Sequence, residues 1–141
     1  MDRRRFIQVG LVGASGVLVL PKMVFAQIPD TPMAGGVYYT EKAPGRWSKK
    51  VALHLPELSI GKGKDALSVQ VMTHHPMDGW EHYIVKHVLL DKDFRFLDEN
   101  MFDPTKDKAP TSTFQLASYS GALYALSVCN KHDTWLNMIE V

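Results

Sequence analysis

Short stretches rich in β-branched and aromatic residues recur along this chain, and turn-forming residues separate them. The clearest stretch is 83–91, where apolar residues occupy both faces of an alternating pattern, as expected of a central strand. The other predicted strands are 69–73, 94–97, 113–117, 122–128 and 135–141. No segment carries a helical apolar stripe over three turns. The pattern predicts an all-β fold, an antiparallel β-sandwich or a barrel of roughly a hundred residues.

Residues 1–26 have the composition of an export signal. A basic start is followed by an apolar run at 9–20 and by a small-residue cleavage signal at 24–26. The sequence Arg3-Arg4-Arg5-Phe6 matches the twin-arginine signal, which carries folded proteins. The apolar run is too short to cross a hydrocarbon core of about 30 Å, so no stable membrane anchor is predicted. We therefore expect a twin-arginine-type signal peptide at 1–26 and a periplasmic protein.

The remaining chain reads as one unit. Residues 27–36 contain two prolines and two glycines without periodicity and predict an extended arm, which leaves 37–141 for a single β-sandwich domain. Removing residues 1–26 takes away four of the 16 basic and one of the 15 acidic residues. This leaves 12 and 14, a net charge of −2. Nucleic-acid phosphates require clustered Lys and Arg, so nucleic acid is not an expected partner.

The only cysteine, Cys129, stands three residues before His132 in the sequence CNKHDTW. A thiolate and an imidazole at this spacing can bind one metal ion from a single tight turn. A cysteine at the end of an apolar strand can also be a small buried hydrophobe. The polar residues after Cys129 end the strand and put the thiol at the rim of the sheet, which favours a metal ligand. A single cysteine also excludes an internal disulfide.

Three further histidines are candidate ligands. His75 and His82 flank one short loop, and Pro76 fixes an extended backbone at His75, so both rings can face one ion. His54 stands in the apolar sequence LHLP, where a histidine is more often a hydrogen-bonded core residue than a ligand. These residues indicate a metalloprotein with nitrogen and sulfur donors, and they suit iron, copper or zinc.

Three motifs carry a family resemblance. Residues 129–135 (CNKHDTW) resemble the C-terminal motif of superoxide reductases of the neelaredoxin and desulfoferrodoxin type. Residues 75–84 (HPMDGWEHYI) resemble the second motif of that family, and His54-Leu55-Pro56 resembles the first. The motifs occur in the family order and span about 80 residues.

The resemblance implies an immunoglobulin-like antiparallel β-sandwich with one mononuclear non-haem iron per chain, cycling between Fe2+ and Fe3+. It implies that Cys129 is the axial sulfur ligand and that the position opposite the sulfur is open. The four implied equatorial ligands are imidazoles: His54, His75, His82 and His132. The implied activity is the one-electron reduction of superoxide to hydrogen peroxide, with electrons from a small donor protein. Related proteins often assemble, so a homodimer or homotetramer is expected.

Three expectations concern the surroundings of these ligands. The backbone N–H groups of Lys131 and His132 can donate to the Cys129 sulfur and tune it. By strand parity, His87 lies on the face opposite His82 and is predicted to be structural. His74 adjoins a proposed ligand and is predicted to point to the other side.

Two departures from the family pattern matter for function. The family commonly has Glu-Lys before the first histidine, where this chain has Ala52 and Leu53, so the glutamate and the steering lysine are both missing. Lys49 and Lys50 lie just upstream, and Lys50 is the candidate for the charge that attracts superoxide, unless both are ordinary surface lysines. The spacing from His75 to His82 is one residue longer than usual, with the insertion at 79–80.

Other metalloproteins fit the same residues. An exported copper electron carrier uses a β-sandwich with a Cys-x-x-His turn and a following methionine, which here is Met138. A copper carrier needs only two histidine ligands, so His75 and His82 would not both bind the metal. A structural zinc module with Cys129 and three histidines is a third interpretation. An iron protein that carries electrons without superoxide turnover is a fourth.

Overall fold

The computed structural model describes residues 27–141, so the predicted export signal at 1–26 lies outside the described residues. In the described part the chain is almost entirely β-structure, with a 3-10 turn and a single helical turn before the first strand, η1 (Gly45–Trp47) and α2 (Val51–His54). The strands are β1 (Glu57–Lys62), β2 (Leu67–Met72), β3 (Ile84–Leu90), β4 (Phe96–Met101), β5 (Thr111–Leu116), β6 (Ala122–Cys129) and β7 (Asp133–Glu140).

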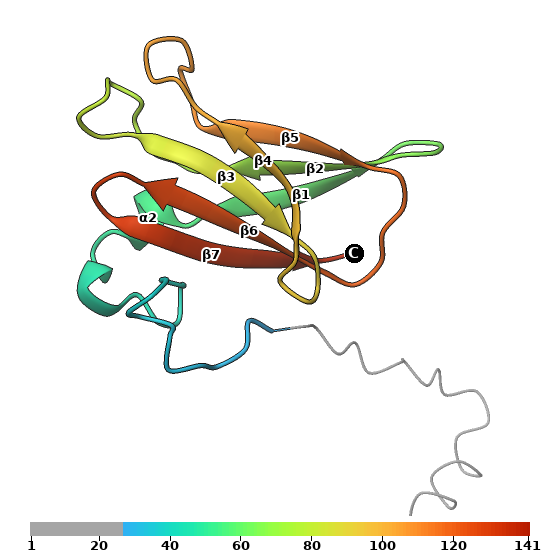
Figure 1. Ribbon diagram of the computed structural model, residues 1–141, viewed down its shortest axis with the longest axis horizontal. Coiled ribbons are helices and arrows are strands. Elements are labelled where there is room, and N and C mark those ends of the chain that lie inside the picture. The colour runs from blue at the N-terminus through green and yellow to red at the C-terminus, as the bar shows by residue number, and fades with distance from the viewer. Residues whose placement is uncertain (1–26) are drawn as a thin grey trace, which may run out of the picture.

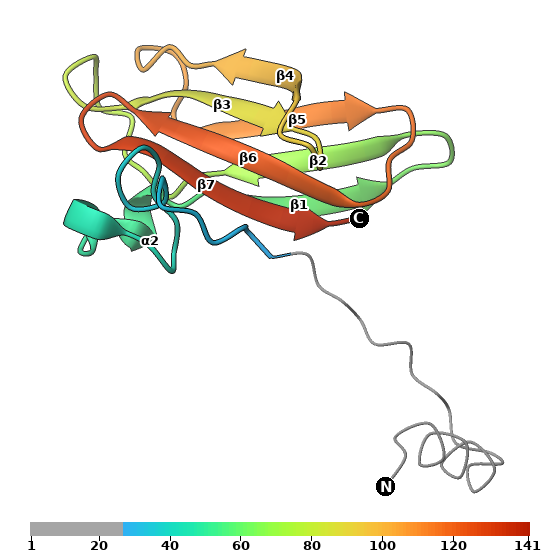
Figure 2. The same cartoon turned by 60° about the horizontal axis from the view of Figure 1, so that its bottom comes forward.

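These strands form two antiparallel sheets that lie face to face (Figures 1 and 2). The smaller sheet has the order β1-β2-β5 and the larger has the order β4-β3-β6-β7. Seven strands in two antiparallel sheets is the architecture of immunoglobulin-like sandwiches, here with the fourth strand paired to the third. The predicted immunoglobulin-like antiparallel β-sandwich is confirmed.

The main core fills the space between the two sheets. Strand β2 alternates between buried and more exposed residues, so Val69 and Val71 face inward. They pack with Leu89 of β3, Phe114 of β5 and Leu123 of β6. Because side chains alternate along a strand, each of these strands contributes one face to this core.

The observed strands begin and end within two residues of the predicted ones, except at β1 and β4. Strand β1 was not predicted, because it is a half-exposed edge strand with only Leu58 and Ile60 as apolar members and a glycine at position 61. Strand β4 begins at Phe96 and not at Phe94, since Phe94 has a positive φ of 61° in a turn held by the Asp91 carboxylate. Pairing with β2 therefore decides that β1 forms, and the chemistry of the turn decides where β4 begins.

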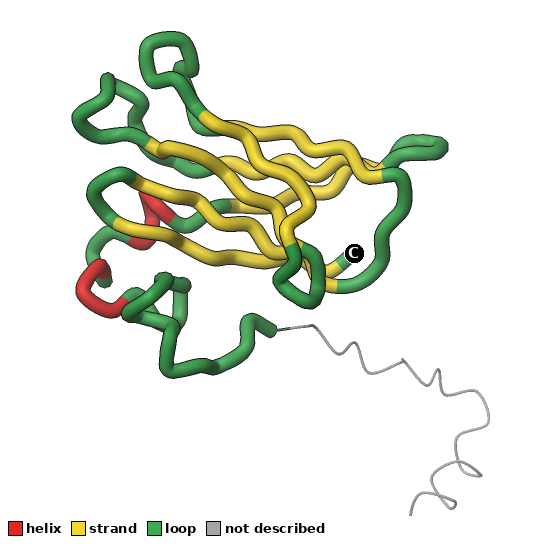
Figure 3. Tube along the Cα trace, in the orientation of Figure 1, coloured by secondary structure: helices red, strands yellow, loops and turns green. Residues whose placement is uncertain are grey.

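The segment before β1 and two connections meet at one end of the sandwich (Figure 1). Helix α2, the connection from β2 to β3 and the turn between β6 and β7 all lie there, and Figure 3 shows that the helical residues are confined to this end. The segment that follows the arm is bound to β7: the Tyr39 N–H donates to the Thr134 carbonyl, and the Tyr39 carbonyl accepts from the Leu136 N–H. Within residues 27–141, neither short helix has the length and apolar character needed to cross a membrane.

Candidate metal centre

His54 is positioned by the single turn of α2. Pro56 ends this turn, because the residue before a proline is pushed into extended backbone, and Leu55 has φ −68° and ψ 123°. The side chain of His54 is only 2% exposed, and its Nδ1 lies 2.8 Å from the carbonyl oxygen of Lys50. Burial in an apolar sequence therefore holds one ring nitrogen on the backbone and leaves the other facing the interior.

His75 follows the end of β2 and is fixed by its neighbours in the backbone. The Thr73 N–H donates to the carbonyl of Pro110, and the His75 N–H donates to the carbonyl of Thr73. The Nδ1 of His75 lies 2.7 Å from the carbonyl oxygen of Pro76. The ring is buried and, like that of His54, is oriented by a carbonyl.

His82 stands at the end of a loop that Asn130 holds in place. The Asn130 amide donates to the carbonyls of Glu81 and Trp80 at 2.9 and 3.2 Å, and its oxygen accepts from the Tyr83 N–H at 3.0 Å. Since Asn130 is adjacent to Cys129, one side chain brings the His82 loop to the thiol. The extra length of this loop includes Gly79, whose φ of +133° suits glycine.

Cys129 and His132 belong to the tight turn between β6 and β7. Cys129 is the last residue of β6, is paired with Asp133 and is 3% exposed. The indole N–H of Trp135 donates to the His132 carbonyl at 2.8 Å and so stabilises the turn. The thiol thus lies at the end of its sheet, as the polar residues after it predicted.

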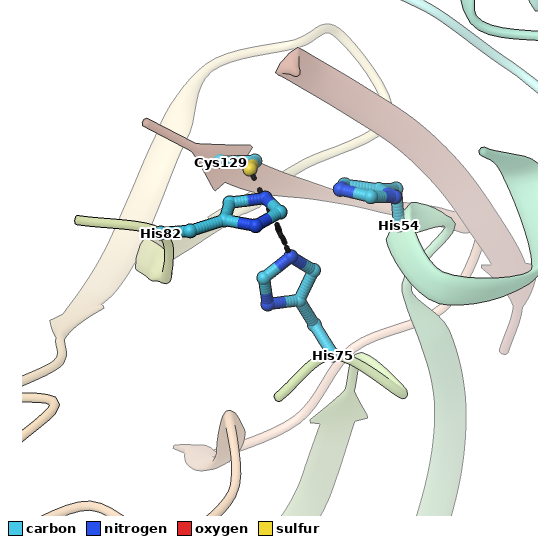
Figure 4. A group of neighbouring side chains, drawn as sticks. All are labelled: His54, His75, His82 and Cys129. Carbon is cyan, nitrogen blue, oxygen red and sulfur yellow. Dashed lines mark hydrogen bonds between the residues drawn. The ribbon is translucent and has the colours of Figure 1, made fainter. Parts of the chain in front are cut away.

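The structure brings all five predicted ligand side chains together. The candidate ligand atoms of His54, His75, His82 and Cys129 lie within 4.8 Å of one another, and Figure 4 shows the four side chains pointing toward one space. His132 completes the group, with its Nδ1 3.0 Å from His82 Nε2 and 3.7 Å from the Cys129 sulfur. His82 Nε2 also lies 3.0 Å from His75 Nε2.

These donors come from both sheets. His54 precedes β1 and His75 follows β2, which are strands of the smaller sheet. His82 precedes β3, Cys129 ends β6, and His132 lies in the turn between β6 and β7 of the larger sheet. The centre therefore lies between the two layers at one end of the sandwich.

The ring nitrogens are arranged as metal ligands. A carbonyl oxygen can only accept, so the Nδ1 atoms of His54 and His75 carry the protons, and their Nε2 atoms present lone pairs to the centre. Within residues 27–141, His54 Nε2 is the buried side-chain N or O atom without a hydrogen-bond partner. An unpaired buried nitrogen is costly, and a metal ion would satisfy it.

Burial keeps the imidazoles in the neutral form that binds metal, whereas it acts against the thiolate form of Cys129. Burial lowers the pKa of His54 to about 4, and burial is also the main cause that lowers the pKa of His75, His82 and His132. The imidazoles are therefore neutral at pH 7, as metal ligation requires. Burial raises the pKa of the Cys129 thiol, and the backbone N–H groups of Lys131 and His132 oppose this rise by donating to the sulfur.

The donor set is compatible with iron and distinguishes between the alternatives. Four imidazoles and one thiol exceed the four donors of a closed tetrahedral zinc site. Met138 packs with Ala122, Tyr124 and Leu136 in an apolar cluster on another part of the sheet. It lies five residues along β7 from the partner of Cys129, about 16 Å at the usual rise of a strand. The copper interpretation with Met138 as axial ligand is therefore wrong.

Two lysines stand near the centre. The positive charges of Lys131 and Lys50 contribute, after burial, to the lowered pKa of both His82 and His132, and both lysines are exposed. Ala52 and Leu53, at the positions of the missing Glu-Lys pair, are exposed as well. The sequence pointed to Lys50 as a source of positive charge. For Lys131 it pointed only to the backbone N–H, so the charge of Lys131 was missed.

Two histidines lie outside the group. His87 is fully buried inside the sandwich, where its Nε2 lies 2.9 Å from Thr73 Oγ1 and its Nδ1 lies 2.8 Å from Ser112 Oγ. His74 is half-exposed and its Nε2 lies 3.1 Å from a carboxylate oxygen of Glu57. Both residues lie outside the ligand group, as predicted, but the parity argument for His87 fails, because His82 precedes β3 and the strand register shifts between Ile84 and Lys86.

Sequence reasoning missed a second group beside the ligands. The Trp47 ring meets the His132 ring edge to face at 4.7 Å, and its indole N–H donates to Asp133 at 2.8 Å. Arg46 also donates to the Asp133 carboxylate, at 2.6 Å. Trp47 and Arg46 stand 86 and 87 positions before Asp133. No sequence pattern links residues at such a separation, so these contacts come from the fold alone.

Known proteins share this fold and these motifs. The family model described as desulfoferrodoxin matches residues 46–138. A single-residue variant of the superoxide reductase (neelaredoxin) from Ignicoccus hospitalis is 29% identical, with a TM-score of 0.65 over 76% of this chain and 94% of that chain. The unsubstituted protein is 28% identical, with a TM-score of 0.62 over 76% of this chain and 95% of that chain.

A superoxide reductase from Nanoarchaeum equitans is 17% identical, with a TM-score of 0.56 over 64% of this chain and 94% of that chain, and this likeness shows the fold alone. No curated protein matches this sequence.

Proposed function

Since the chain belongs to the desulfoferrodoxin family, we propose that it is a superoxide reductase with one mononuclear iron held by four imidazoles and one thiolate. The residues that would hold the iron are His54, His75, His82, Cys129 and His132. The reaction takes one superoxide, one electron and two protons to hydrogen peroxide. The Ignicoccus hospitalis relatives carry the name superoxide reductase and support this assignment.

One observation carries the proposal. His54 Nε2 is buried without a hydrogen-bond partner beside a group formed by the Nε2 atoms of His75 and His82, His132 Nδ1 and the Cys129 sulfur, which have one another as hydrogen-bond partners. A purely structural cluster would also give His54 Nε2 a partner. When bound, iron supplies the one-electron couple between its ferrous and ferric forms that superoxide reduction needs.

The protein contributes preorganisation and a tuned sulfur. Carbonyl oxygens of Lys50 and Pro76 hold two rings in the tautomer that leaves Nε2 free, so no proton has to be displaced from those atoms. Burial keeps water from the Cys129 sulfur, and the N–H groups of Lys131 and His132 moderate its electron donation. The sulfur is the softest and most electron-rich donor of the set.

The entrance attracts an anion. His82 and His132 are less buried than His54 and His75, so the centre opens to solvent on their side. Lys50 and Lys131 stand near these two rings, and their charges lower the rings' pKa. Positive charge at the mouth of a site raises the local concentration of an anionic substrate such as superoxide. We assign this steering to Lys50, with Lys131 as a second charge.

Compartment and partners extend the same proposal. We propose export by the twin-arginine pathway, because the first 26 residues have the composition of such a signal. Export of folded protein would let iron be loaded in the cytoplasm, where copper does not compete by affinity. A small electron-donor protein would restore the reduced centre between turnovers. A homodimer or homotetramer is expected from the family resemblance.

Metal analysis and rapid mixing test the proposal. Protein purified from its native compartment should contain one iron per chain, and the ferrous protein should be oxidised by superoxide in a second-order reaction. Lys50→Ala should slow this reaction about tenfold, the lower end of the range for electrostatic steering, and added salt should weaken the difference. Lys62→Ala is the matched control, since Lys62 ends β1 away from the centre.

Contrary results separate the alternatives. Copper with intense thiolate colour, or colourless zinc, would contradict iron. A ferrous protein that superoxide does not oxidise would be an electron carrier or a sensor and not this enzyme. Equal rates for Lys50→Ala, Lys62→Ala and wild type would remove Lys50 from the mechanism and leave the iron site in place.

A further inference from the structure

Asp133 has a backbone conformation that L-residues rarely adopt. Its φ is +64°, and within residues 27–141 Phe94 is the other non-glycine residue with a positive φ. A turn that needs this conformation is normally supplied by glycine and only occasionally by asparagine or aspartate, because a side chain crowds the backbone there. Strained residues persist where the surrounding structure requires them, which directs attention to what the Asp133 side chain does.

The Asp133 carboxylate binds a different part of the chain and not its own turn. Its Oδ2 accepts from Arg46 Nη2 at 2.6 Å and from the indole N–H of Trp47 at 2.8 Å. The Arg46 guanidinium lies 4.6 Å from the Trp47 ring centroid, and the centroid of the His132 ring lies 4.7 Å from it. One carboxylate thereby holds an indole against a proposed metal ligand.

The same contact continues to a second proposed ligand. The Lys50 N–H donates to the Trp47 carbonyl at 2.8 Å. The Lys50 carbonyl lies 2.8 Å from His54 Nδ1. A chain of three hydrogen bonds thus runs from Asp133 through Trp47 and Lys50 to the ring of His54.

We propose that Asp133 is a positioning residue that latches residues 44–54 onto the turn between β6 and β7 and so sets His54, His132 and Lys50 relative to one another. The inference rests on the proposed function only in taking these histidines as metal ligands. Without the carboxylate, the segment that carries Lys50 and His54 loses both hydrogen bonds to the turn that carries Cys129 and His132 and keeps only the ring contact of Trp47 with His132. The strained φ is then the cost of a contact that glycine cannot make.

An ordinary surface ion pair is the competing explanation. The side chains of Arg46 and Asp133 are 65% and 41% exposed, and exposed ion pairs often contribute little. The pair of Lys86 on β3 and Glu99 on β4, with N and O 3.1 Å apart and 33% and 39% exposed, is such a contact and involves neither Asp133 nor residues 44–54, so it serves as the matched control. A latch predicts effects at the metal centre that the control pair does not produce.

Asp133→Gly is the decisive variant, because glycine relieves the backbone strain while it removes the carboxylate. We expect the full chain to remain folded, with Co2+ affinity about 10- to 100-fold lower in chelator competition, the usual effect of losing a partner that orients ligands. We also expect a changed visible spectrum of the bound Co2+. In the metal-free protein, the Lys50 amide should exchange hydrogen about tenfold faster, since its partner Trp47 is released. Glu99→Gln should change none of these.

A double-mutant cycle keeps the test independent of folding losses. Trp47→Phe keeps an aromatic ring beside His132 but removes the N–H that Asp133 accepts. If the two residues act as one latch, the double variant loses no more Co2+ affinity than the more damaging single variant. Additive losses, or wild-type affinity and Lys50 exchange in Asp133→Gly, would overturn the proposal. Failure of wild type to bind Co2+ would contradict the metal site, while amide exchange would still report on the latch.

Discussion

Two polar groups that contain histidine lie inside this sandwich and at its end, and they differ in how the ring nitrogens are satisfied. Inside the sandwich, both nitrogens of His87 meet hydroxyl groups, those of Thr73 and Ser112. Thr73 also lies 2.8 Å from Ser127 Oγ, and Asn100 donates to Ser112. At the end of the sandwich, His54 Nε2 has no partner, and ring nitrogens face one another.

This difference separates a structural polar network from a ligand set. Burial lowers the pKa of both His54 and His87 to about 4, so neither burial nor the pKa tells the two apart. Hydrogen-bond saturation does, because a network that is complete leaves no lone pair for an ion. Substitutions in one group should therefore change metal binding, and substitutions in the other should change the stability of the metal-free protein.

The largest effect is expected on metal affinity. Cys129→Ala or His75→Ala should lower metal affinity by more than about 100-fold, since losing a direct ligand costs more than losing a partner that only orients one. Chelator competition and the metal content per chain measure this. His87→Gln is the control and should keep one metal ion per chain. A parallel loss of metal in His87→Gln would show that the buried network belongs to the binding site.

The next effect is on the free energy of unfolding of the metal-free protein. Thr73→Val keeps the shape of the side chain but deprives His87 Nε2 and Ser127 Oγ of a partner, which should cost about 2 to 4 kcal/mol. His54→Leu removes the unpaired Nε2 together with the hydrogen bond from Nδ1 to the Lys50 carbonyl, so the two effects oppose each other and the net change should be below about 1 kcal/mol. Urea unfolding after metal removal measures both. Equal destabilisation by the two changes would contradict the distinction between the groups.

A smaller effect is the pH dependence of metal-free stability. The pKa of His87 is about 4 in the folded protein and near 6.5 when unfolded, so the unfolded chain binds the proton more readily between these values. Stability is therefore complete above pH 6.5 and falls as the pH is lowered to 4, by up to about 3 kcal/mol for this residue. Unfolding in urea at several pH values should show this slope. An unchanged slope in His87→Gln would show that other groups cause it.

The smallest effect is expected at His74, which adjoins the ligand His75 in sequence. Its contact with Glu57 is half-exposed, so His74→Ala should change the free energy of unfolding by less than about 0.5 kcal/mol and leave metal affinity unaltered. Urea unfolding and metal titration of the same sample test both statements. Lowered metal affinity would mean that the ring of residue 74, and not only that of residue 75, supports the centre.

The sequence predicted the parts of this protein that depend on local patterns. The alternation of 83–91 and the apolar run before Cys129 located β3 and β6, and polar residues located the turn between β6 and β7. Motif spacing brought the candidate ligands into one group. The setting of His54 was ambiguous, because its apolar neighbours suit a core residue as well as a ligand.

What the sequence did not predict depends on contacts between distant segments. The half-exposed edge strand β1 lacked a clear pattern, and the Thr73 and Ser112 partners of His87 come from other strands. Arg46 and Trp47 bind Asp133 across separations of 87 and 86 positions, and local sequence spacing cannot predict such contacts. Such contacts are set by how the two sheets pack, which periodicity does not encode.

The centre draws its donors from both layers of the sandwich, and this has a mechanical consequence. An ion bound by residues from both sheets is a cross-link, so pulling the layers apart at that end would require breaking metal–ligand bonds. Loss of the ion would free that end to open, while the apolar interior farther along keeps the layers joined. Metal supply would then control the lifetime of the folded protein as well as its chemistry.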